Sequence, residues 1–403
     1  MKPIVIIGAG ISGLQAARLL ESQGVQYILL EKSEKIGGRV QTETVDGFVL
    51  DHGFQVLQTA YPEVQRSLDL KKLDLSYFGS GAYVFLKGQF QPFLNPFKKP
   101  FDFIRSLGSG LVSVKDLILL GYVWIRLQGD VKAMDGSKET VGALIDRLGF
   151  SPQFKELFLR PFLAGVLLDD HLAQPASLFY FYMKQFLEGD AAIPKTGMGA
   201  IASQVAEAIP ADKIRLGMSV ARILDNRVEL ENGELLEFSA LILATEPNVA
   251  ADLLGVSSAN HESLASETFY FHTKAKGKLA PYLYLLPQGS PILHFSCLSA
   301  LDASFSSPGD SLFSVTALTL GNSPEKIKVA LADRLGQKAS DFRFVKSFAI
   351  PHSLWRVSDF QALKMEAARR NIVLAGDYTQ FPSLQAALSS GRLAAESVME
   401  KVQ

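Results

Sequence analysis

The sequence predicts an α/β fold in which a lobe built on a parallel sheet is interleaved with an α+β lobe and covered by a helical cap. Three observations carry this prediction. Residues 3–31 read as strand, glycine-rich turn, helix and second strand. A short apolar strand at residues 372–375 is followed by a final helix. With 403 residues the chain is too long for one small core, so two intertwined lobes are expected.

The first unit carries a glycine fingerprint for a dinucleotide. The run Gly8-Ala9-Gly10-Ile11-Ser12-Gly13 follows the buried strand at residues 4–7 and opens a helix that stops near Gly24. Gly8 permits a tight turn, Gly10 lets the backbone approach a pyrophosphate, and Gly13 lets helix and strand pack closely. The helix N-terminus then offers N–H groups to the phosphates. This pattern predicts a Rossmann-like lobe, although the fingerprint alone serves NAD as well as FAD.

The second strand, residues 25–30, ends at Glu31 and Lys32. A carboxylate at this position accepts hydrogen bonds from both ribose hydroxyls and repels a 2′-phosphate. Gly37-Gly38-Arg39 follow shortly afterwards. Arg39 could be an ordinary surface arginine, but after two glycines and near a pyrophosphate we expect its guanidinium to pair with phosphate oxygens.

Two further motifs complete a family pattern. Asp51-His52-Gly53 follows the GGR element, and Gly376-Asp377 precedes the last helix. With the fingerprint and Glu31, these positions resemble the flavin-containing amine oxidase superfamily, which includes protoporphyrinogen oxidases, phytoene desaturases and monoamine oxidases. The resemblance implies FAD rather than NAD. It also implies noncovalent binding, since no counterpart is found of the cysteine-containing loop to which covalent members attach flavin.

The last helix is expected to begin near Pro382-Ser383. By resemblance its positive end points at the flavin N1–C2=O edge, so the N–H groups of Leu384, Gln385 and Ala386 would stabilise negative charge there. The resemblance also assigns Asp377 to the ribitol hydroxyls and Val220 to the adenine edge. The expected cofactor-binding residues are therefore Gly8, Gly10, Ile11, Ser12, Gly13, Glu31, Lys32, Gly37, Gly38, Arg39, Gly53, Phe54, Val220, Ala244, Gly376, Asp377, Leu384, Gln385 and Ala386.

The pattern along the chain predicts three parts. Residues 1–60, 195–255 and 365–403 form the FAD-binding domain, with a hairpin turning at Asp46-Gly47 and three strands after Lys213. Residues 61–194 form a helical cap that is rich in aromatic residues. Residues 256–364 form a substrate domain with several strands and one helix at residues 324–335.

Catalytic side chains are not identified by any motif. HExxH and GxSxG are absent and the six histidines are scattered, so metal and serine-hydrolase chemistry lack support. His52 and Lys195 lie in segments that the resemblance brings near the flavin, but a structural histidine and a solvated loop lysine are the more ordinary interpretations. Because the cofactor carries the hard step in flavin chemistry, a separate acid or base is not required.

Composition limits the partners. The net charge of −1 gives no case for nucleic acid, and the single cysteine, Cys297, excludes a disulfide within the chain. The apolar run at residues 117–125 is half the length of a membrane span, which leaves peripheral membrane contact open. A cytoplasmic protein is expected, since the chain enters its first strand by residue 3 without room for a cleavable signal.

The expected function is an FAD-dependent oxidoreductase that accepts hydride at flavin N5 from a hydrophobic small molecule and passes electrons to oxygen or a quinone. Three alternatives stay open: a flavin-dependent isomerase without net redox, an NAD-linked enzyme, and a non-catalytic dinucleotide-binding protein.

Overall fold

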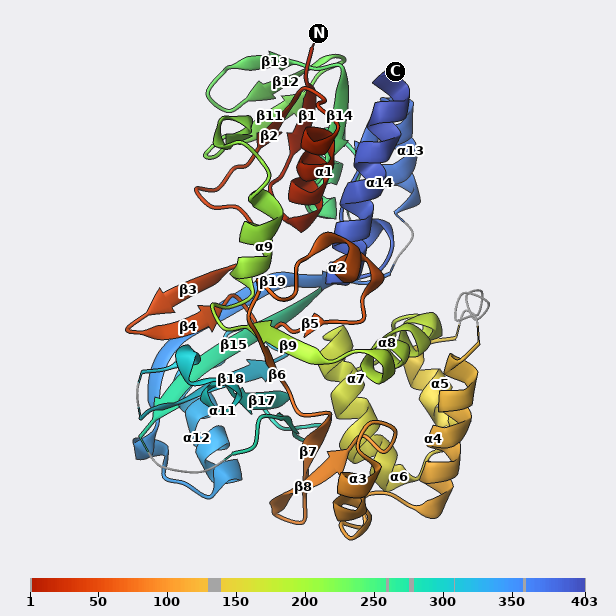
Figure 1. Ribbon diagram of the computed structural model, residues 1–403, viewed down its shortest axis with the longest axis vertical. Helices are drawn as coiled ribbons and strands as arrows, with labels where there is room; N and C mark the ends of the chain where they lie inside the picture. Colours follow the sequence, from red (N-terminus) through yellow and green to blue (C-terminus); the bar gives the residue numbers. More distant parts are fainter. Residues whose placement is uncertain are drawn as a thin grey trace.

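The computed structural model describes residues 2–129, 139–258, 261–274, 279–307, 309–357 and 360–402. The lobe that the sequence predicts to bind the nucleotide, at the top of Figure 1, contains a five-stranded parallel sheet in the order β10-β2-β1-β14-β20. The strands are β1 (Ile4–Ile7), β2 (Tyr27–Leu30), β10 (Ile214–Arg215), β14 (Ala240–Leu243) and β20 (Ile372–Leu374). Both ends of the chain therefore supply strands to one sheet, as predicted.

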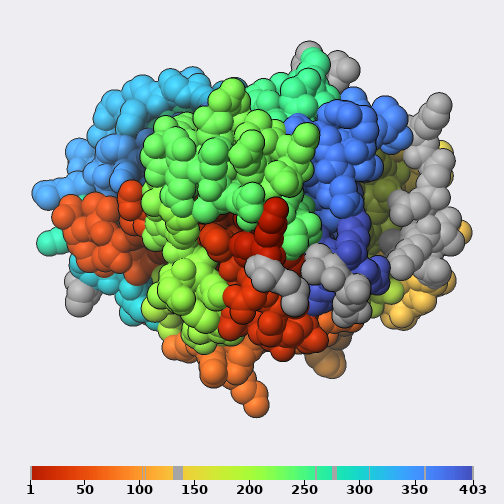
Figure 2. Space-filling view, turned by 90° about the horizontal axis from the view of Figure 1, so that it is seen from above, coloured from red at the N-terminus to blue at the C-terminus, as the bar shows by residue number. Residues whose placement is uncertain are grey.

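Both faces of this sheet are covered, which is why β1 is apolar throughout. Ile4 and Ile6 join the core under α1 (Ile11–Ser22) and α14 (Leu384–Val402), whereas Val5 and Ile7 join a second core. The two helices lie side by side in Figure 1, and a Cβ on Gly391 would come 2.1 Å from the carbonyl oxygen of Ser12. The N-terminal residues, the strands near residues 210–240 and the C-terminal segment share one face of the molecule (Figure 2).

The segment after Lys213 forms five strands rather than the predicted three. Its first run splits into β10, which joins the parallel sheet, and β11 (Val220–Ile223). Its last run splits into β13 (Leu235–Glu237) and β14. Strands β11, β12 (Arg227–Leu230) and β13 form a separate antiparallel sheet. Together with α10 (Pro247–Leu254) and α13 (Gln361–Arg369), this sheet covers the second face of the parallel sheet.

The lobe in which the sequence predicts the substrate domain contains a seven-stranded sheet in the order β19-β15-β18-β17-β16-β7-β8. Its later strands are β15 (Ser263–Thr273), β16 (Leu283–Leu285), β17 (His294–Cys297), β18 (Ser311–Ala317) and β19 (Arg343–Trp355). The helices beside it are α11 (Leu298–Leu301) and α12 (Pro324–Leu335), the latter as predicted. Alternate residues Phe269, Phe271, Phe295, Phe313 and Val315 fill the core on one side of the sheet.

Residues 81–94 do not belong to a helical cap. They form β7 (Gly81–Leu86) and β8 (Gln89–Leu94), and β7 pairs in parallel with β16. The hairpin turns at Lys87 and Gly88, whose φ angles are +52° and +82°. Positive φ at both central residues is the requirement of the type I′ turn, one of the two common two-residue hairpin turns. The local signal was therefore present, but the surrounding aromatic and proline residues obscured it.

The helical cap itself begins at residue 100. Its helices are α3 (Pro100–Leu107), α4 (Val114–Leu127), α5 (Val141–Leu148), α6 (Pro152–Phe154), α7 (Arg160–Leu167) and α8 (Ala176–Glu188), with a π-helical turn at Lys155–Leu159 between α6 and α7. Ser113 and Asp116 form a capping box at the start of α4. The buried Asp116 carboxylate also accepts hydrogen bonds from the N–H and hydroxyl of Ser151, which ties α4 to α6.

Shorter elements connect the lobes. They are the predicted hairpin β3 (Thr42–Val45) and β4 (Phe48–Asp51), a small sheet of β5 (Leu57–Gln58), β9 (Ala191–Pro194) and β6 (Leu75–Tyr77), and the helices α2 (Pro62–Ser67) and α9 (Gly199–Ala206). Among the described residues, no helix is both long and apolar enough to cross a bilayer.

Candidate functional site

A cavity of about 730 Å³ runs through the molecule where these lobes meet. One end lies at the carboxyl edge of the parallel sheet and is lined by Gly8, Glu31 and Ala244. The other end lies in the cap and is lined by aromatic residues such as Phe158 and Phe186. Ligands of open parallel sheets bind beyond the carboxyl ends of the strands, so the first end is the expected position of a dinucleotide.

Each of the three fingerprint glycines is favoured at its position for a different structural reason. Gly8 has φ +102°, and a Cβ there would lie 2.8 Å from the carbonyl oxygen of Ala244. A Cβ on Gly13 would lie 1.9 Å from the carbonyl oxygen of Gly8, so only glycine lets α1 pack this closely on β1. A Cβ on Gly10, in contrast, would meet nothing within 4 Å. Gly10 lines the cavity, so its open side is where a pyrophosphate would approach.

Glu31 is held firmly beside this turn. Its side chain is buried, and Oε2 accepts the N–H of Ala9 at 2.7 Å. Oε1 accepts the N–H of Ser33 at 3.0 Å and is also bonded by the Ser33 hydroxyl. An ionised carboxylate offers about four acceptor positions, so capacity is left for ribose hydroxyls. Glu31 and Lys32 both line the cavity, in agreement with their expected location.

The end of the cavity at the carboxyl edge of the parallel sheet is closed by two segments far apart in sequence. Val220 at the start of β11 and Ala244 directly after β14 both line the cavity. Gly37 and Gly38 face the fingerprint, and a Cβ on Gly38 would lie 3.2 Å from the Cα of Gly10. Ile11 and Ser12 line the cavity at the start of α1. These predicted residues are therefore brought together in one place.

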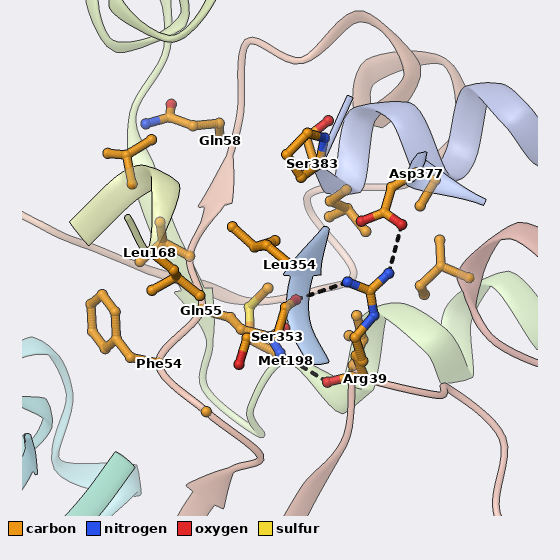
Figure 3. A pocket seen from close by; sticks show the side chains of 18 of the residues that line it. Arg39, Phe54, Gln55, Gln58, Leu168, Met198, Ser353, Leu354, Asp377 and Ser383 are labelled. Carbon is orange, nitrogen blue, oxygen red and sulfur yellow. Dashed lines mark hydrogen bonds and ion pairs between the residues drawn. The ribbon is translucent and has the colours of Figure 1, made fainter. Parts of the chain in front are cut away.

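Arg39 and Asp377 bind each other in this structure. Arg39 Nη2 donates to Asp377 Oδ1 at 2.6 Å, and Nη1 donates to the carbonyl oxygen of Ser353 at 2.8 Å (Figure 3). Burial lowers the pKa of Arg39, but Asp377 more than offsets this, so the pKa is raised overall. The sequence predicts separate partners for the two residues, phosphate for Arg39 and ribitol for Asp377. Their ion pair puts both at the middle of the cavity, 338 positions apart in sequence.

The start of α14 faces the same region. Gly376, with φ +151°, donates its N–H to Ser390 Oγ at 3.0 Å, and the Tyr182 hydroxyl donates to the Pro382 carbonyl at 2.5 Å. Pro382, Ser383 and Leu384 line the cavity. Helix N-termini leave N–H groups without intrahelical partners, so this end can stabilise an anionic group.

One of the three predicted helix donors is already occupied within the protein. The N–H of Ala386 donates to Ser383 Oγ at 3.0 Å, an N-cap bond that leaves it unavailable to a ligand. The Gln385 side chain is turned toward α2, where Oε1 accepts the N–H of Glu63 at 2.8 Å. Neither residue lines the cavity. The first-turn N–H groups of Leu384 and Gln385 therefore remain as the candidate donors, because the cap uses that of Ala386.

The candidate catalytic residues His52 and Lys195 do not line the cavity. His52 stacks on Phe348 with ring centroids 4.4 Å apart, beside the β3–β4 hairpin. Lys195 forms an ion pair with Asp74 at 3.0 Å. The structure therefore favours the structural and solvated-loop interpretations. Gly53, with φ +95°, does line the cavity, and Phe54 is fixed there by its N–H, which donates to Thr268 Oγ1 at 3.1 Å.

Asp51, at the end of β4, is buried just behind this wall. Its Oδ1 accepts the Thr42 hydroxyl at 2.5 Å and the N–H of Met198 at 2.8 Å. Burial raises the pKa of Asp51 to about 6, although both hydrogen bonds oppose the shift. The D-x-G motif therefore supports the chain around the cavity rather than supplying a side chain to it.

Sequence reasoning missed two polar residues in the cavity wall. Gln58 in β5 and His294 in β17 are 2% and 1% exposed, and neither side chain has a hydrogen-bond partner among the described residues. Burial lowers the pKa of His294 to about 3, so the imidazole is neutral. In the sequence, His294 is recognisable only as a polar residue within an apolar strand. This observation points to the cavity wall only once the neighbouring strands are known. No group of three potential metal ligands occurs in the described parts of the chain.

Comparison with known proteins agrees with this geometry. The model of the flavin-containing amine oxidoreductase family matches residues 11–331. The chain belongs to this family. Membership confirms the resemblance predicted from the motifs and implies a flavin cofactor.

Curated relatives are distant. Protoporphyrinogen oxidase 2 of Arabidopsis thaliana is 25% identical over 173 residues, which are 42% of this chain and 33% of that protein. Coproporphyrinogen III oxidase of Bacillus subtilis is 22% identical over 298 residues, covering 63% of this chain and 62% of that protein. The match thus spans about a third of the first relative and under two thirds of the second.

Solved structures share the whole fold. A putative protoporphyrinogen oxidase from Exiguobacterium has a TM-score of 0.73 at 16% identity, covering 99% of both chains. A UDP-galactopyranose mutase has a TM-score of 0.70 at 14% identity, covering 100% of this chain and 96% of that one. At these identities the likeness concerns the fold, which confirms the predicted α/β architecture.

Proposed function

We propose that the protein is an FAD-dependent oxidoreductase that binds FAD noncovalently and oxidises a hydrophobic small molecule. The observation that carries the proposal is the continuous cavity, which joins the fingerprint and Glu31 to an aromatic chamber in the cap by way of Arg39 and Asp377. When bound, the flavin would accept a hydride at N5. The chain supplies position and electrostatics: Glu31 and Gly10 hold the adenosine diphosphate half, and the start of α14 offers N–H groups to the flavin ring.

The cofactor is tested by purification and reconstitution. Purified protein should be yellow and release FAD, rather than FMN, on heating. Its release by heat also shows noncovalent attachment. A colourless protein that takes up NAD but no FAD would contradict the assignment and favour the NAD-linked alternative.

The substrate chamber is mainly apolar, which supports a hydrophobic substrate. Phe158, Phe162, Phe186 and Val166 line it. Because relatives are named for porphyrinogen oxidation, and other structures of this fold for oxidation of amines, the test is anaerobic flavin bleaching by protoporphyrinogen IX, cyclohexylamine and phenylalanine in parallel. Reoxidation by oxygen or by a quinone then identifies the electron acceptor. If none of these substrates bleaches the flavin, the substrate classes that they represent lose their support.

A flavin-dependent isomerase is the second candidate. The specific observation in its favour is the shared fold with a UDP-galactopyranose mutase over the whole chain. An isomerase would convert its substrate without consuming an acceptor. Turnover of UDP-galactopyranose by reduced protein, with no oxygen uptake, would favour this candidate over the oxidoreductase.

The cap also supports the expected peripheral membrane contact. Large apolar side chains on α3 and α4 are exposed, among them Phe101 at 87% and Ile118 at 68%. The exposed lysines 99 and 115 adjoin them, and the neighbouring Phe97 and Leu120 line the cavity. We propose that this face, at the lower right of Figure 1, lies on an anionic lipid surface, so that an apolar substrate enters the cavity from the bilayer.

Vesicle cosedimentation tests this contact. The protein should bind phosphatidylcholine vesicles that contain phosphatidylglycerol, and binding should fall several-fold in Phe101→Glu and Ile118→Glu. Leu235→Glu changes another exposed apolar residue, 49% exposed on β13 and outside the cap, and should bind normally. Equal binding by all three variants would show that the cap face is not the contact.

A further inference from the structure

His294 is a polar side chain placed where an apolar ligand would lie. It is 1% exposed, lines the cap end of the cavity, and contacts the Phe54 ring, with centroids 4.8 Å apart. Neither Nδ1 nor Nε2 has a hydrogen-bond partner among the described residues. Buried polar groups are normally paired, and an unpaired one destabilises the fold. An imidazole without partners in a ligand cavity therefore indicates that its partner is a ligand.

A glycine in the facing helix leads to the same conclusion independently. Gly165 lies inside α7, where glycine is less favourable than alanine, and its φ is not in the positive range. The backbone therefore gives no reason for it. A Cβ at this position would lie 3.1 Å from His294 Nδ1 and 3.4 Å from Cε1, closer than side chains normally approach. The absent methyl group leaves room at Nδ1, and Gly165 also lines the cavity.

The surroundings restrict what can bind there. Phe162, Val166 and Leu283 line the adjoining cavity wall and offer only apolar surface. Thr316 lies opposite His294 on the neighbouring strand, and its hydroxyl is also buried without a partner in the described part of the chain. A charged group would lose its hydration in such a wall, whereas a neutral N–H or O–H would lose little and gain a bond to a neutral imidazole.

We propose that His294 Nδ1, in the space left by Gly165, accepts a hydrogen bond from an uncharged N–H or O–H group of an otherwise apolar ring compound. The inference rests on the proposed function, since it concerns the substrate of the same cavity. It makes His294 a specificity-determining residue, and it names the substrate class as apolar rings that carry a neutral hydrogen-bond donor.

Indole and 1-methylindole form the matched probe pair, because they differ by one N–H donor. Both are titrated calorimetrically into the full-length protein, and histidine ring nitrogens are followed by ¹⁵N NMR. Indole should bind about tenfold more tightly, as expected for one net hydrogen bond. Indole should also shift the ring signal that disappears in His294→Phe, whereas 1-methylindole should leave it unchanged.

Variants separate this role from a purely structural one. His294→Phe should bind both probes equally, and His294→Gln, which keeps an acceptor, should retain part of the preference. Gly165→Ala fills the space at Nδ1 and should reduce indole binding while His294 is intact. Gly121→Ala is the matched control, since Gly121 lies inside α4 and a Cβ there meets nothing within 4 Å.

Equal binding of the two probes, binding of neither, or a preference that survives His294→Phe would overturn the proposal. If His294→Phe does not fold, Gly165→Ala and the NMR shift decide the question. The titrations need no flavin turnover and are repeated on flavin-free protein. A protein that takes up no FAD would refute the proposed function, while a failed probe preference would refute only the role of His294.

Discussion

Glu31 provides the sharpest test of the nucleotide site, because its contacts separate folding from binding. Glu31→Ala removes Oε2, which accepts the buried N–H of Ala9 at a distance of 2.7 Å. It also removes Oε1, which accepts both the N–H and the hydroxyl of Ser33. The orphaned N–H should lower the free energy of unfolding by about 1–3 kcal/mol. The two ribose hydroxyls lose bonds to a charged acceptor, which should weaken FAD binding by about 2–4 kcal/mol, or roughly 30- to 700-fold in Kd.

The assay is fluorescence titration of flavin-free protein with FAD, after circular dichroism has shown that each variant is folded. Glu31→Gln keeps one oxygen acceptor and should fall between the parent and Glu31→Ala. Glu34→Ala removes a carboxylate three residues away that does not line the cavity, and it should bind FAD normally. If Glu31→Ala binds FAD as tightly as the parent, the carboxylate does not hold the ribose and the assignment of this end of the cavity is wrong.

Three further predictions concern folding and binding. Gly10→Ala should leave the melting temperature unchanged but weaken FAD binding at least tenfold. Gly13→Ala should lower the melting temperature itself, because its Cβ would lie 1.9 Å from the Gly8 carbonyl oxygen. Equal melting temperatures in thermal scans of the two flavin-free variants would contradict this difference. The pKa of Asp51 is raised to about 6 by burial, so the folded state binds the proton more tightly and the free energy of unfolding should fall by about 2 kcal/mol as pH rises from 4 to 7. Asp51→Asn should remove this decline, which is measured by urea unfolding at each pH from 4 to 7. If the variant keeps the same dependence of stability on pH, Asp51 is not the group responsible. Asp116→Ala should lower stability by about 2–4 kcal/mol in urea unfolding, because it removes the cap of α4 and its bonds to α6 together, and a loss below 1 kcal/mol would show that these bonds contribute little.

Local sequence determined the nucleotide half of the protein. The positive φ of Gly8 and the close approach of Gly13 to the Gly8 carbonyl oxygen both arise within one βαβ unit, so a pattern of about thirty residues specifies them. Glu31 follows for the same reason, since it ends the strand that pairs with β1. The hairpin at Asp46-Gly47 and the start of the last helix are also encoded by adjacent residues, and the structure reproduces both.

What only the tertiary structure decided depends on pairing between distant segments. Strand β7 joins β16 some 200 residues later, so no local pattern could assign it to the substrate sheet. The ion pair of Arg39 with Asp377 and the facing of His294 by Gly165 arise in the same way. Each of these residues has an ordinary local environment in the sequence. The interactions of each residue depend on the charged group or the empty space that lies beside it in the folded protein. Those neighbours are determined by how the lobes pack together.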